Sequence, residues 1–254
     1  MLSNTLREKL RSNAPVSGCT ISGFVPDQVE ILGLLGYDFA FLDSEHWPLN
    51  DRELSIMIMA GDAAGIACLV RVRENSPAAI QRVMDSGAAG IIVPDCSTPK
   101  LVKQAADALK YAPIGNRGLS TTRASSYGLR MGLADYVKYA NDHSVLVCQI
   151  ESREGLENAE RIVANDLIDT VFIGTTDLSH DLGHTGQRNH PEVDAAVERI
   201  VSCARQAGKA YGAMVRAGEN PHDYIKQGYA MTVATGSSFF TGGAQHYIRQ
   251  FAGK

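Results

Sequence analysis

The chain lacks any run of about 20 apolar residues, so we expect no segment of it to cross a membrane. Its first residues mix charged and apolar side chains without the apolar stretch of a secretory signal, which indicates a cytoplasmic protein. Five cysteines are scattered along the sequence, form no CxxC pair and mostly adjoin apolar runs. This pattern predicts buried, reduced thiols rather than disulfides or a zinc site.

A surplus of basic charge is also missing. The sequence has 24 lysine and arginine residues against 28 aspartate and glutamate residues, a formal net charge of -4 at pH 7. Such a balance offers no broad basic surface for nucleic acid or anionic lipid. We therefore expect a small molecule as the partner, with no nucleic acid and no membrane.

The composition that remains is that of a folded chain with a large core. Apolar residues make up 44% of the 254 residues and charged residues 20%, so a sizeable core can form. Although the chain exceeds the usual length of one domain, α/β barrels commonly reach about this size as one unit. The expectation is one domain over residues 1–254.

Short apolar runs alternate with amphipathic segments along the whole chain, which is typical of βαβ units and hence of a parallel sheet. Eight runs are predicted as strands, the number that closes a single (β/α)8 TIM barrel: Val16–Gly23, Asp38–Asp43, Cys68–Arg73, Gly90–Pro94, Val145–Glu151, Thr170–Gly174, Tyr211–Val215 and Met231–Thr235. The predicted helices are Pro26–Gly36, Asp51–Ala64, Pro77–Ser86, Thr98–Tyr111, Glu154–Asn165, Pro191–Ala207, Asn220–Gly228 and a last one from about Ser238.

A doubly wound open sheet would give the same alternation. No GxGxxG motif follows the first predicted strand and no P-loop appears, so the barrel is favoured. The one long irregular stretch, Ala112–Met131, follows the fourth predicted strand and is polar and glycine-bearing. Long loops in compact domains are usually functional or mobile.

Polar side chains stand at the ends of four predicted strands, where the active sites of such barrels lie. Each alone could be a helix N-cap or half of a structural ion pair. Together they favour a site, because gathering like charges is costly unless a cation or a reaction uses them. They are Asp43, Glu45, His46 and Trp47 after the second strand, Arg71 and Arg73 in the third, Gln149 and Glu151 in the fifth, and Asp177 after the sixth.

Glu151 and Asp177 together would form a site with two carboxylates. Oxygen ligands with open positions suit Mg2+ or Mn2+ better than a structural zinc, which would take Cys or several His. No lysine stands where a Schiff base would form, at the carboxyl end of a predicted strand. If the chain makes or breaks a carbon–carbon bond, the expected electron sink is therefore a metal ion.

Several segments, in order and spacing over roughly residues 15 to 240, resemble the HpcH/HpaI class II 2-keto-acid aldolases. No single motif is diagnostic, but the set is specific. The matching segments are Asp43–His46, Val70–Arg71, Asp85–Pro94, Gly115–Gly118, Tyr127–Gly128, Gln149–Glu151, Phe172–Ser179 and Leu182–Gly183.

The resemblance implies roles for particular residues. Glu151 and Asp177 are implied to hold a divalent metal, Mg2+, Mn2+ or Co2+, whose shell the keto and carboxylate oxygens of pyruvate complete. Arg71 is implied to face the keto oxygen, and His46, in a dyad with Asp43, to serve as the base through a water.

Other implied roles concern the substrate and a neighbouring subunit. The positions expected around the bound 2-keto acid are Gln149, Gly174, Thr175 and Thr176. Asp85 is implied to approach the site from another subunit, so the resemblance implies a homo-oligomer, commonly a hexamer.

The sequence departs from the family pattern at two places. Thr175 follows Gly174 where the family usually has Gly-Pro, and this change touches the backbone expected to cradle the pyruvate carboxylate. Near the eighth strand, Ser237 and Ser238 follow Gly236 where the family often has Gly-x-Asp. Neither change removes an expected metal ligand or the expected base.

The predicted function is reversible cleavage of a 4-hydroxy-2-keto acid to pyruvate, or a close 2-keto acid, and an aldehyde through a metal-bound enolate. Such a reaction would serve the catabolism of aromatic compounds or sugar acids. Three other hypotheses stay open: a CoA-ester lyase of the citrate-lyase β type, a phosphosugar isomerase or epimerase that binds phosphate at Thr235–Ser238, and a catalytically silent barrel.

Two features have more than one interpretation. Trp47 and the Arg117–Tyr127 loop could contact the aldehyde half of the substrate, but core packing or a subunit contact would explain them equally well. The last helix, Phe239–Phe251, carries enough apolar residues to cover a neighbouring subunit, or else to close its own barrel.

Overall fold

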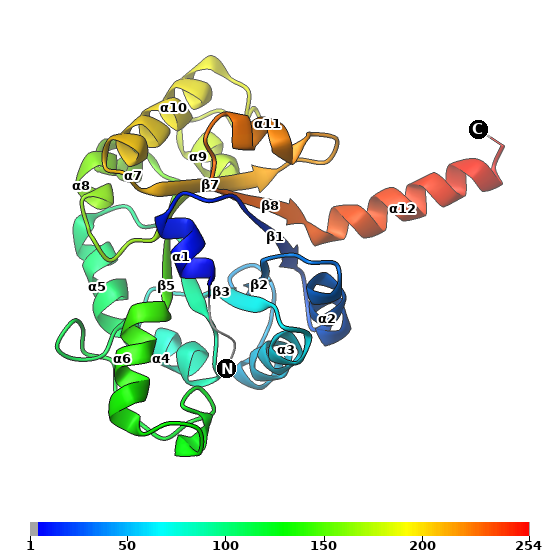
Figure 1. The fold of residues 1–254 in the computed structure, drawn as a ribbon. Coiled ribbons are helices and arrows are strands. Elements are labelled where there is room, and N and C mark those ends of the chain that lie inside the picture. The colour runs from blue at the N-terminus through cyan, green and yellow to red at the C-terminus, as the bar shows by residue number, and fades with distance from the viewer. Residues whose placement is uncertain (1–4, 254) are drawn as a thin grey trace.

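Eight parallel strands close into a barrel in chain order, with helices around the outside (Figure 1). The computed structural model describes residues 5–253. The strands are β1 (Val16–Ile21), β2 (Phe39–Asp43), β3 (Ala67–Arg71), β4 (Gly90–Val93), β5 (Val145–Ile150), β6 (Thr170–Ile173), β7 (Ala210–Val215) and β8 (Met231–Thr235). The prediction of a single (β/α)8 TIM barrel is confirmed. That residues 1–254 form one domain stays a prediction, and residues 1–4 and 254 lie outside the described part.

The helices include three that the sequence did not predict, α1, α6 and α9. The helices are α1 (Leu6–Arg11), α2 (Pro26–Leu34), α3 (Asp51–Ala64), α4 (Pro77–Asp85), α5 (Pro99–Leu109), α6 (Leu133–His143), α7 (Arg153–Glu157), α8 (Ala159–Val163), α9 (Thr175–Asp181), α10 (Pro191–Gln206), α11 (Pro221–Lys226) and α12 (Gly236–Phe251). The stretch predicted as irregular, Ala112–Met131, holds a single 3₁₀ turn at Ser126–Gly128. No described helix is long and apolar enough to span a membrane.

Local sequence explains where most of these helices begin. Five of them have proline in the first turn, where its missing N–H costs no hydrogen bond. The side chain of Asn50 caps α3, and Glu53 returns the bond to the backbone of Asn50, which completes a capping box. Ser76 and Thr98 cap α4 and α5 in the same way, without the return bond.

Alternate residues of each strand divide between two cores. One core fills the barrel interior and includes Phe39 and Phe41 of β2, Leu69 of β3 and Phe172 of β6. The other core lies between the strands and the surrounding helices. Because side chains alternate along a strand, a residue two positions beyond an inward-facing one also faces inward. The inward rows of β2, β3 and β5 end in Asp43, Arg71 and Glu151, which places these three side chains at one mouth of the barrel.

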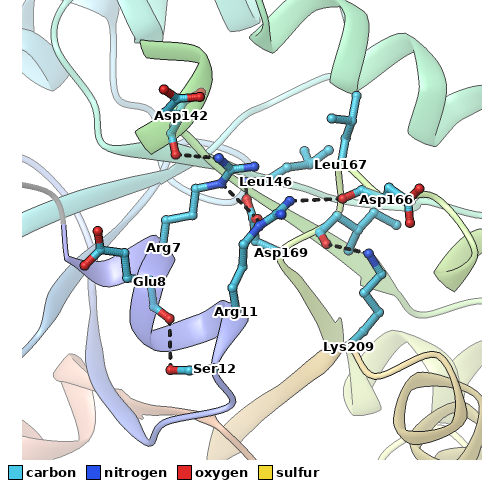
Figure 2. Close-up of polar contacts among 12 residues, drawn as sticks. Arg7, Glu8, Arg11, Ser12, Asp142, Leu146, Asp166, Leu167, Asp169 and Lys209 are labelled. Carbon is cyan, nitrogen blue, oxygen red and sulfur yellow. Dashed lines mark hydrogen bonds and ion pairs between the residues drawn. The ribbon is translucent and has the colours of Figure 1, made fainter. Parts of the chain in front are cut away.

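The opposite, amino-terminal end of the barrel is closed by α1 (Figure 1). Figure 2 shows Arg7 and Arg11 of α1 converging on Asp169, which directly precedes β6. The Asp169 carboxylate is fully buried and accepts from Arg7 Nε at 3.0 Å, Arg11 Nε at 2.7 Å and the Leu146 N–H at 3.0 Å. Since removing one partner of a buried ion pair leaves an uncompensated charge, this cluster ties α1 firmly to β5 and β6.

Lys110 is a second buried charge at this end. Its Nζ donates to the carbonyl oxygens of Asn141 and Ser144, both at 2.8 Å, and to Ser144 Oγ at 2.9 Å. Burial lowers its pKa to about 7, and the charge of Arg7 adds to the effect. Ser144 directly precedes β5, so Lys110 lies at the end of the barrel opposite the mouth that holds Glu151. Lys110 is therefore not placed to form a Schiff base at that mouth.

Helix α12 projects away from the barrel instead of packing against it (Figure 1). None of its residues is buried, and every residue from Phe239 to Phe251 is exposed. Apolar side chains at the end of α2 are exposed too: Ile31 and Leu34 on the helix, and Leu35 directly after it. Of the two interpretations of the last helix, closure of its own barrel is therefore wrong for this conformation.

The cysteines are free thiols, as predicted. Four of the five are buried and Cys203 is half-buried. Burial raises the pKa of Cys19 to about 11 and of Cys68 to about 12. Thiols held this far from their thiolate form are poor nucleophiles and poor metal ligands, so they act as core residues.

Candidate active site

Asp43 and Arg71 form the most strongly bonded pair at the carboxyl-terminal mouth. They lie opposite each other in the register of β2 and β3. Asp43 accepts from Arg71 Nε at 2.9 Å and from Arg71 Nη2 at 2.6 Å. Burial alone would lower the pKa of Arg71, but the hydrogen bonds and charge of Asp43, with the charges of Glu45 and Glu151, raise it. The guanidinium is therefore held as a fixed cation.

His46 is an exposed imidazole at the mouth. Its side chain is 59% exposed, and its Nε2 lies 3.7 Å from Glu45 Oε2, which in turn lies 3.2 Å from Arg71 Nε. Asp43 Oδ1 accepts the backbone N–H groups of Glu45 at 3.1 Å and His46 at 3.4 Å. The expected contact of Asp43 with the His46 ring is thus replaced by a contact with the His46 backbone, because Arg71 occupies both carboxylate oxygens. Glu45 is the acid beside the ring.

Glu151 is a buried carboxylate with a fixed orientation. Its Oε1 accepts the Asp95 N–H at 2.7 Å, and its Oε2 accepts from Gln149 Nε2. A Cβ at Gly174 would lie 2.4 Å from Glu151 Oε2 and 2.6 Å from Glu151 Cβ, so only glycine leaves room for this side chain. Glycine at position 174 therefore allows the Glu151 side chain to occupy its position without a steric clash.

Asp177 faces the same space from α9, which begins directly after β6. It lies in the first turn of that helix and is exposed to solvent, beside Thr175 and Thr176. Burial raises the pKa of Glu151, and the negative charges of Glu45 and Asp177 raise it further, whereas its bonds to Asp95 and Gln149 lower it. Burial likewise raises the pKa of Glu45. A set of mutually repelling carboxylates like this one fits a divalent cation, which would relieve the repulsion.

Comparison with known proteins decides the family. The chain matches the HpcH/HpaI aldolase/citrate lyase family over residues 17–241. It belongs to that family. The chain is 34% identical to a 5-keto-4-deoxy-D-glucarate aldolase of Klebsiella pneumoniae subsp. pneumoniae, over 92% of this chain and 90% of the relative. It is therefore an aldolase, a carbon–carbon lyase that cleaves a hydroxy keto acid.

Solved structures of the family agree with this assignment. A family protein from Burkholderia cenocepacia J2315 is 30% identical, with a TM-score of 0.91 over 98% of this chain and 99% of the other. The HpcH/HpaI aldolase from Desulfitobacterium hafniense DCB-2 is 26% identical, with a TM-score of 0.91 over 97% of this chain and 96% of that one. The resemblance identified from the sequence motifs is confirmed.

Asp85 lies apart from the other predicted site residues of the aldolase. It ends α4, which runs antiparallel to the strands, so within one chain it stands at the amino-terminal end of the barrel. There its Oδ1 accepts from Arg117 Nη2 at 2.6 Å, and the Arg117 side chain is fully buried. Arg117 thus has a structural contact within the chain. A role for Asp85 in catalysis requires a second subunit, as the resemblance implied.

Two residues of the aldolase site were not assigned roles from the sequence. Glu45 was noted only as one of two acids after the second strand, but it contacts both Arg71 and the His46 ring. Asp95 follows β4 with a φ of 42°, and its N–H fixes Glu151. A polar residue directly after a strand could have indicated Asp95, but nothing in the sequence shows that its backbone, rather than its side chain, would take part.

Proposed function

We propose that this aldolase uses a divalent metal held by Glu151 and Asp177 to cleave a 4-hydroxy-2-keto acid into pyruvate and an aldehyde. The observation that carries the proposal is the group of charges at one mouth: buried Glu151, nearby Asp177 and the fixed cation Arg71. Gln149 and the backbone of Gly174, Thr175 and Thr176 surround the same space and would contact the 2-keto acid.

The donor set suits a hard cation with open positions. Two carboxylates, one after β5 and one on α9, leave room for substrate oxygens. Among the described residues, no group of three possible metal ligands joins Glu151 to a cysteine or histidine that would select zinc. A bound Mg2+, Mn2+ or Co2+ would act as a Lewis acid on the keto group. The proton transfer and the positioning of the substrate would fall to the protein residues around the metal.

Arg71 and His46 would divide the chemistry between them. His46 would take the proton from the 4-hydroxyl group, directly or through a water, as the bond between C3 and C4 breaks and the 4-carbon becomes the aldehyde. The electron pair of that bond passes to the pyruvate half, whose developing negative oxygen faces the Arg71 guanidinium. Asp43 would keep that guanidinium in place. Addition is the same path reversed.

The substrate that we propose is an open-chain sugar acid with a 2-keto group. The curated relatives are named for 5-keto-4-deoxy-D-glucarate and match 92% of this chain, so that compound is the first to test. A CoA-ester lyase is disfavoured. This chain has Asp43, Glu45 and His46 after β2, an arrangement that we expect in the aldolases and not in that class.

A phosphosugar site at Thr235–Ser238 is disfavoured by the contacts there. The Gly236 N–H is bonded to Thr20 Oγ1 at 3.2 Å, and Ser238 Oγ is bonded to the Thr235 carbonyl at 2.5 Å. A Cβ at Gly236 would lie 2.3 Å from the Thr20 carbonyl oxygen. Glycine at this position thus serves the close approach of α12 to β1, and not an anion.

The proposal is tested by incubating the enzyme and Mn2+ with 5-keto-4-deoxy-D-glucarate and measuring pyruvate. We expect pyruvate in equal amounts to the aldehyde product, and a loss of at least about 100-fold in kcat/KM for Glu151→Gln, since a charged metal ligand becomes neutral. Full activity of Glu151→Gln, with retained fold by circular dichroism, would contradict the assigned site.

We also propose that the enzyme works as a homo-oligomer, a hexamer, in the cytoplasm. The exposed apolar faces of α12 and α2 suit a second copy of the chain, in which one subunit's α12 covers another subunit's α2. The free thiols suit a reducing compartment. Light scattering should give an oligomer for the full chain and smaller species for Phe240→Ser with Ile248→Ser. A monomeric full chain would contradict the proposal.

A further inference from the structure

Arg216 directly follows β7 and stands on the inward-facing row of that strand. Met214, two residues before it, packs against the core of the barrel interior. Because side chains alternate along a strand, Arg216 continues the row of Met214 toward the mouth. The inward rows of β3 and β5, elsewhere around the barrel, end in Arg71 and Glu151 at the same mouth. Arg216 therefore reaches the catalytic mouth from the side of β7.

The surroundings of Arg216 place it beside α9. Ile173, the last residue of β6, pairs with Ala213 of β7, so Arg216 lies at the level where β6 has given way to α9. Arg216 and Thr176, the neighbour of Asp177, line one hollow together with residues 186–191. This hollow adjoins the end of α9 that carries Asp177.

The hollow is cationic because two arginines, Arg188 and Arg216, line it, and no carboxylate is found among the described residues that do so. Arg216 Nη1 donates to Asn189 Oδ1 at 2.6 Å, and its nearest carboxylate oxygen, Glu219 Oε1, lies 3.8 Å from Nη1. The side chain of Arg216 is 30% exposed. A guanidinium has five N–H donors, so Arg216 can bind a ligand and keep its bond to Asn189.

Glu219 does not cancel this charge. Its Oε2 accepts from Tyr224 Oη at 2.6 Å and from the Arg216 N–H at 3.1 Å, bonds that shape the turn after β7. The bond from Tyr224, with the charges of Arg216 and Arg188, lowers the pKa of Glu219. One carboxylate therefore faces two arginines, and a net positive charge remains for a ligand.

We propose that Arg216, together with Arg188, binds a carboxylate at the far end of the aldehyde half of the substrate. The inference rests on the proposed function and names the residues that would bind the second carboxylate of such a substrate. Cleavage of a keto acid with a carboxylate at each end leaves one carboxylate on pyruvate and the other on the aldehyde. Arginine binds a carboxylate through two parallel hydrogen bonds, which would fix the aldehyde for attack on its carbonyl carbon.

A matched set of aldehydes tests the assignment in the direction of addition. The probes are 2-hydroxy-3-oxopropanoate, glyceraldehyde, which replaces the carboxylate with a hydroxymethyl group, and glyceraldehyde 3-phosphate. Each is offered to the full enzyme with pyruvate and Mn2+. We expect the wild-type enzyme to prefer the carboxylate over both others. In Arg216→Gln the ratio of kcat/KM for the carboxylate to that for glyceraldehyde should fall about 10- to 100-fold, mainly through KM.

Control variants separate charge from structure. Arg199, an exposed arginine on α10 that does not line the hollow, provides a matched control, and Arg199→Gln should leave the ratio unchanged. Arg216→Lys should lose less than Arg216→Gln, because it keeps the charge without the paired bonds. If Arg216→Gln does not fold, Arg188→Gln should still lower the ratio.

Several outcomes would overturn the inference. An unchanged ratio in folded Arg216→Gln, or an equal loss in Arg199→Gln, would remove Arg216 from the site. A wild-type preference for glyceraldehyde 3-phosphate would replace the carboxylate by a phosphate and make the carboxylate assignment wrong. Failure of the proposed function looks different, since no aldehyde would then react with pyruvate at all.

Discussion

Asp43 and Arg71 are joined by two hydrogen bonds across adjacent strands, of 2.9 and 2.6 Å, so the carboxylate holds the guanidinium rather than the histidine ring. The same carboxylate accepts the backbone N–H groups of Glu45 and His46. Asp43 therefore positions both residues that we propose to be catalytic, Arg71 through its side chain and His46 through its backbone.

Asp43→Asn should impair every step that depends on Arg71. The neutral amide has one oxygen acceptor and no charge, so it cannot accept both hydrogen bonds from Arg71. Because a charged hydrogen bond is lost, we expect kcat/KM for aldol cleavage to fall about 10- to 100-fold. Exchange of the pyruvate methyl protons should fall as well. Normal exchange beside impaired cleavage would instead link Asp43 to His46 alone.

His46→Ala should give the opposite pattern. Loss of a positioned base typically costs about 10²- to 10⁴-fold, and we expect cleavage to fall within that range. Pyruvate methyl-proton exchange and oxaloacetate decarboxylation should persist in part, because they depend mainly on the metal site and Arg71. Cleavage at the wild-type rate in His46→Ala would remove this residue from the mechanism.

Asp169→Asn should destabilise the barrel without changing its chemistry. The buried carboxylate compensates Arg7 and Arg11 at the end opposite the mouth (Figure 2), and its loss should lower the free energy of unfolding by about 3–5 kcal/mol. Asp142→Asn is the matched control, since Arg7 contacts Asp142 only through its carbonyl oxygen. Urea unfolding measures the free energy of unfolding of both variants. An equal loss in Asp142→Asn would show that the local negative charge, and not the buried ion pair, stabilises the barrel.

Lys110 should make stability depend on pH. Burial first, and then the charge of Arg7, lower its pKa from 10.5 to about 7 in the folded protein. Between these values the unfolded chain binds a proton that the folded chain does not, so stability should rise with pH. The slope should be at most about 1.4 kcal/mol per pH unit.

The measurement is the free energy of unfolding between pH 7.5 and 9.5, for the wild type and Lys110→Met. The variant should lack the rise. Three oxygen acceptors around Nζ oppose the lowered pKa by favouring the ammonium form. A wild-type curve parallel to that of Lys110→Met would mean that these acceptors keep Lys110 charged throughout.

The barrel itself could be predicted from the sequence because strands and helices differ in periodicity, and eight strands of that kind close in one common way. Helices α6 and α9 were harder to predict from the sequence. Helix α6 follows a polar loop and begins after Gly132, with neither a capping side chain nor a first-turn proline to mark its start. Helix α9 is short and begins directly after β6, where a loop was expected.

The site could be predicted as a set of residues but not as a set of contacts. That Asp43 pairs with Arg71 depends on the strand register, which apolar periodicity does not specify. That Gly174 must be glycine depends on the position of Glu151 on the neighbouring strand. Arg216 was not singled out, because an arginine after a strand is unremarkable until its inward row and the nearby Arg188 are known.

The most direct test of the central claim is exchange of the pyruvate methyl protons in D2O, followed by NMR. The reaction needs no aldehyde, so it isolates the site of Glu151, Asp177 and Arg71. We predict exchange with Mg2+, Mn2+ or Co2+, its loss in EDTA, its recovery when metal is restored, and none in Glu151→Gln. Exchange at the full rate in EDTA would contradict the account.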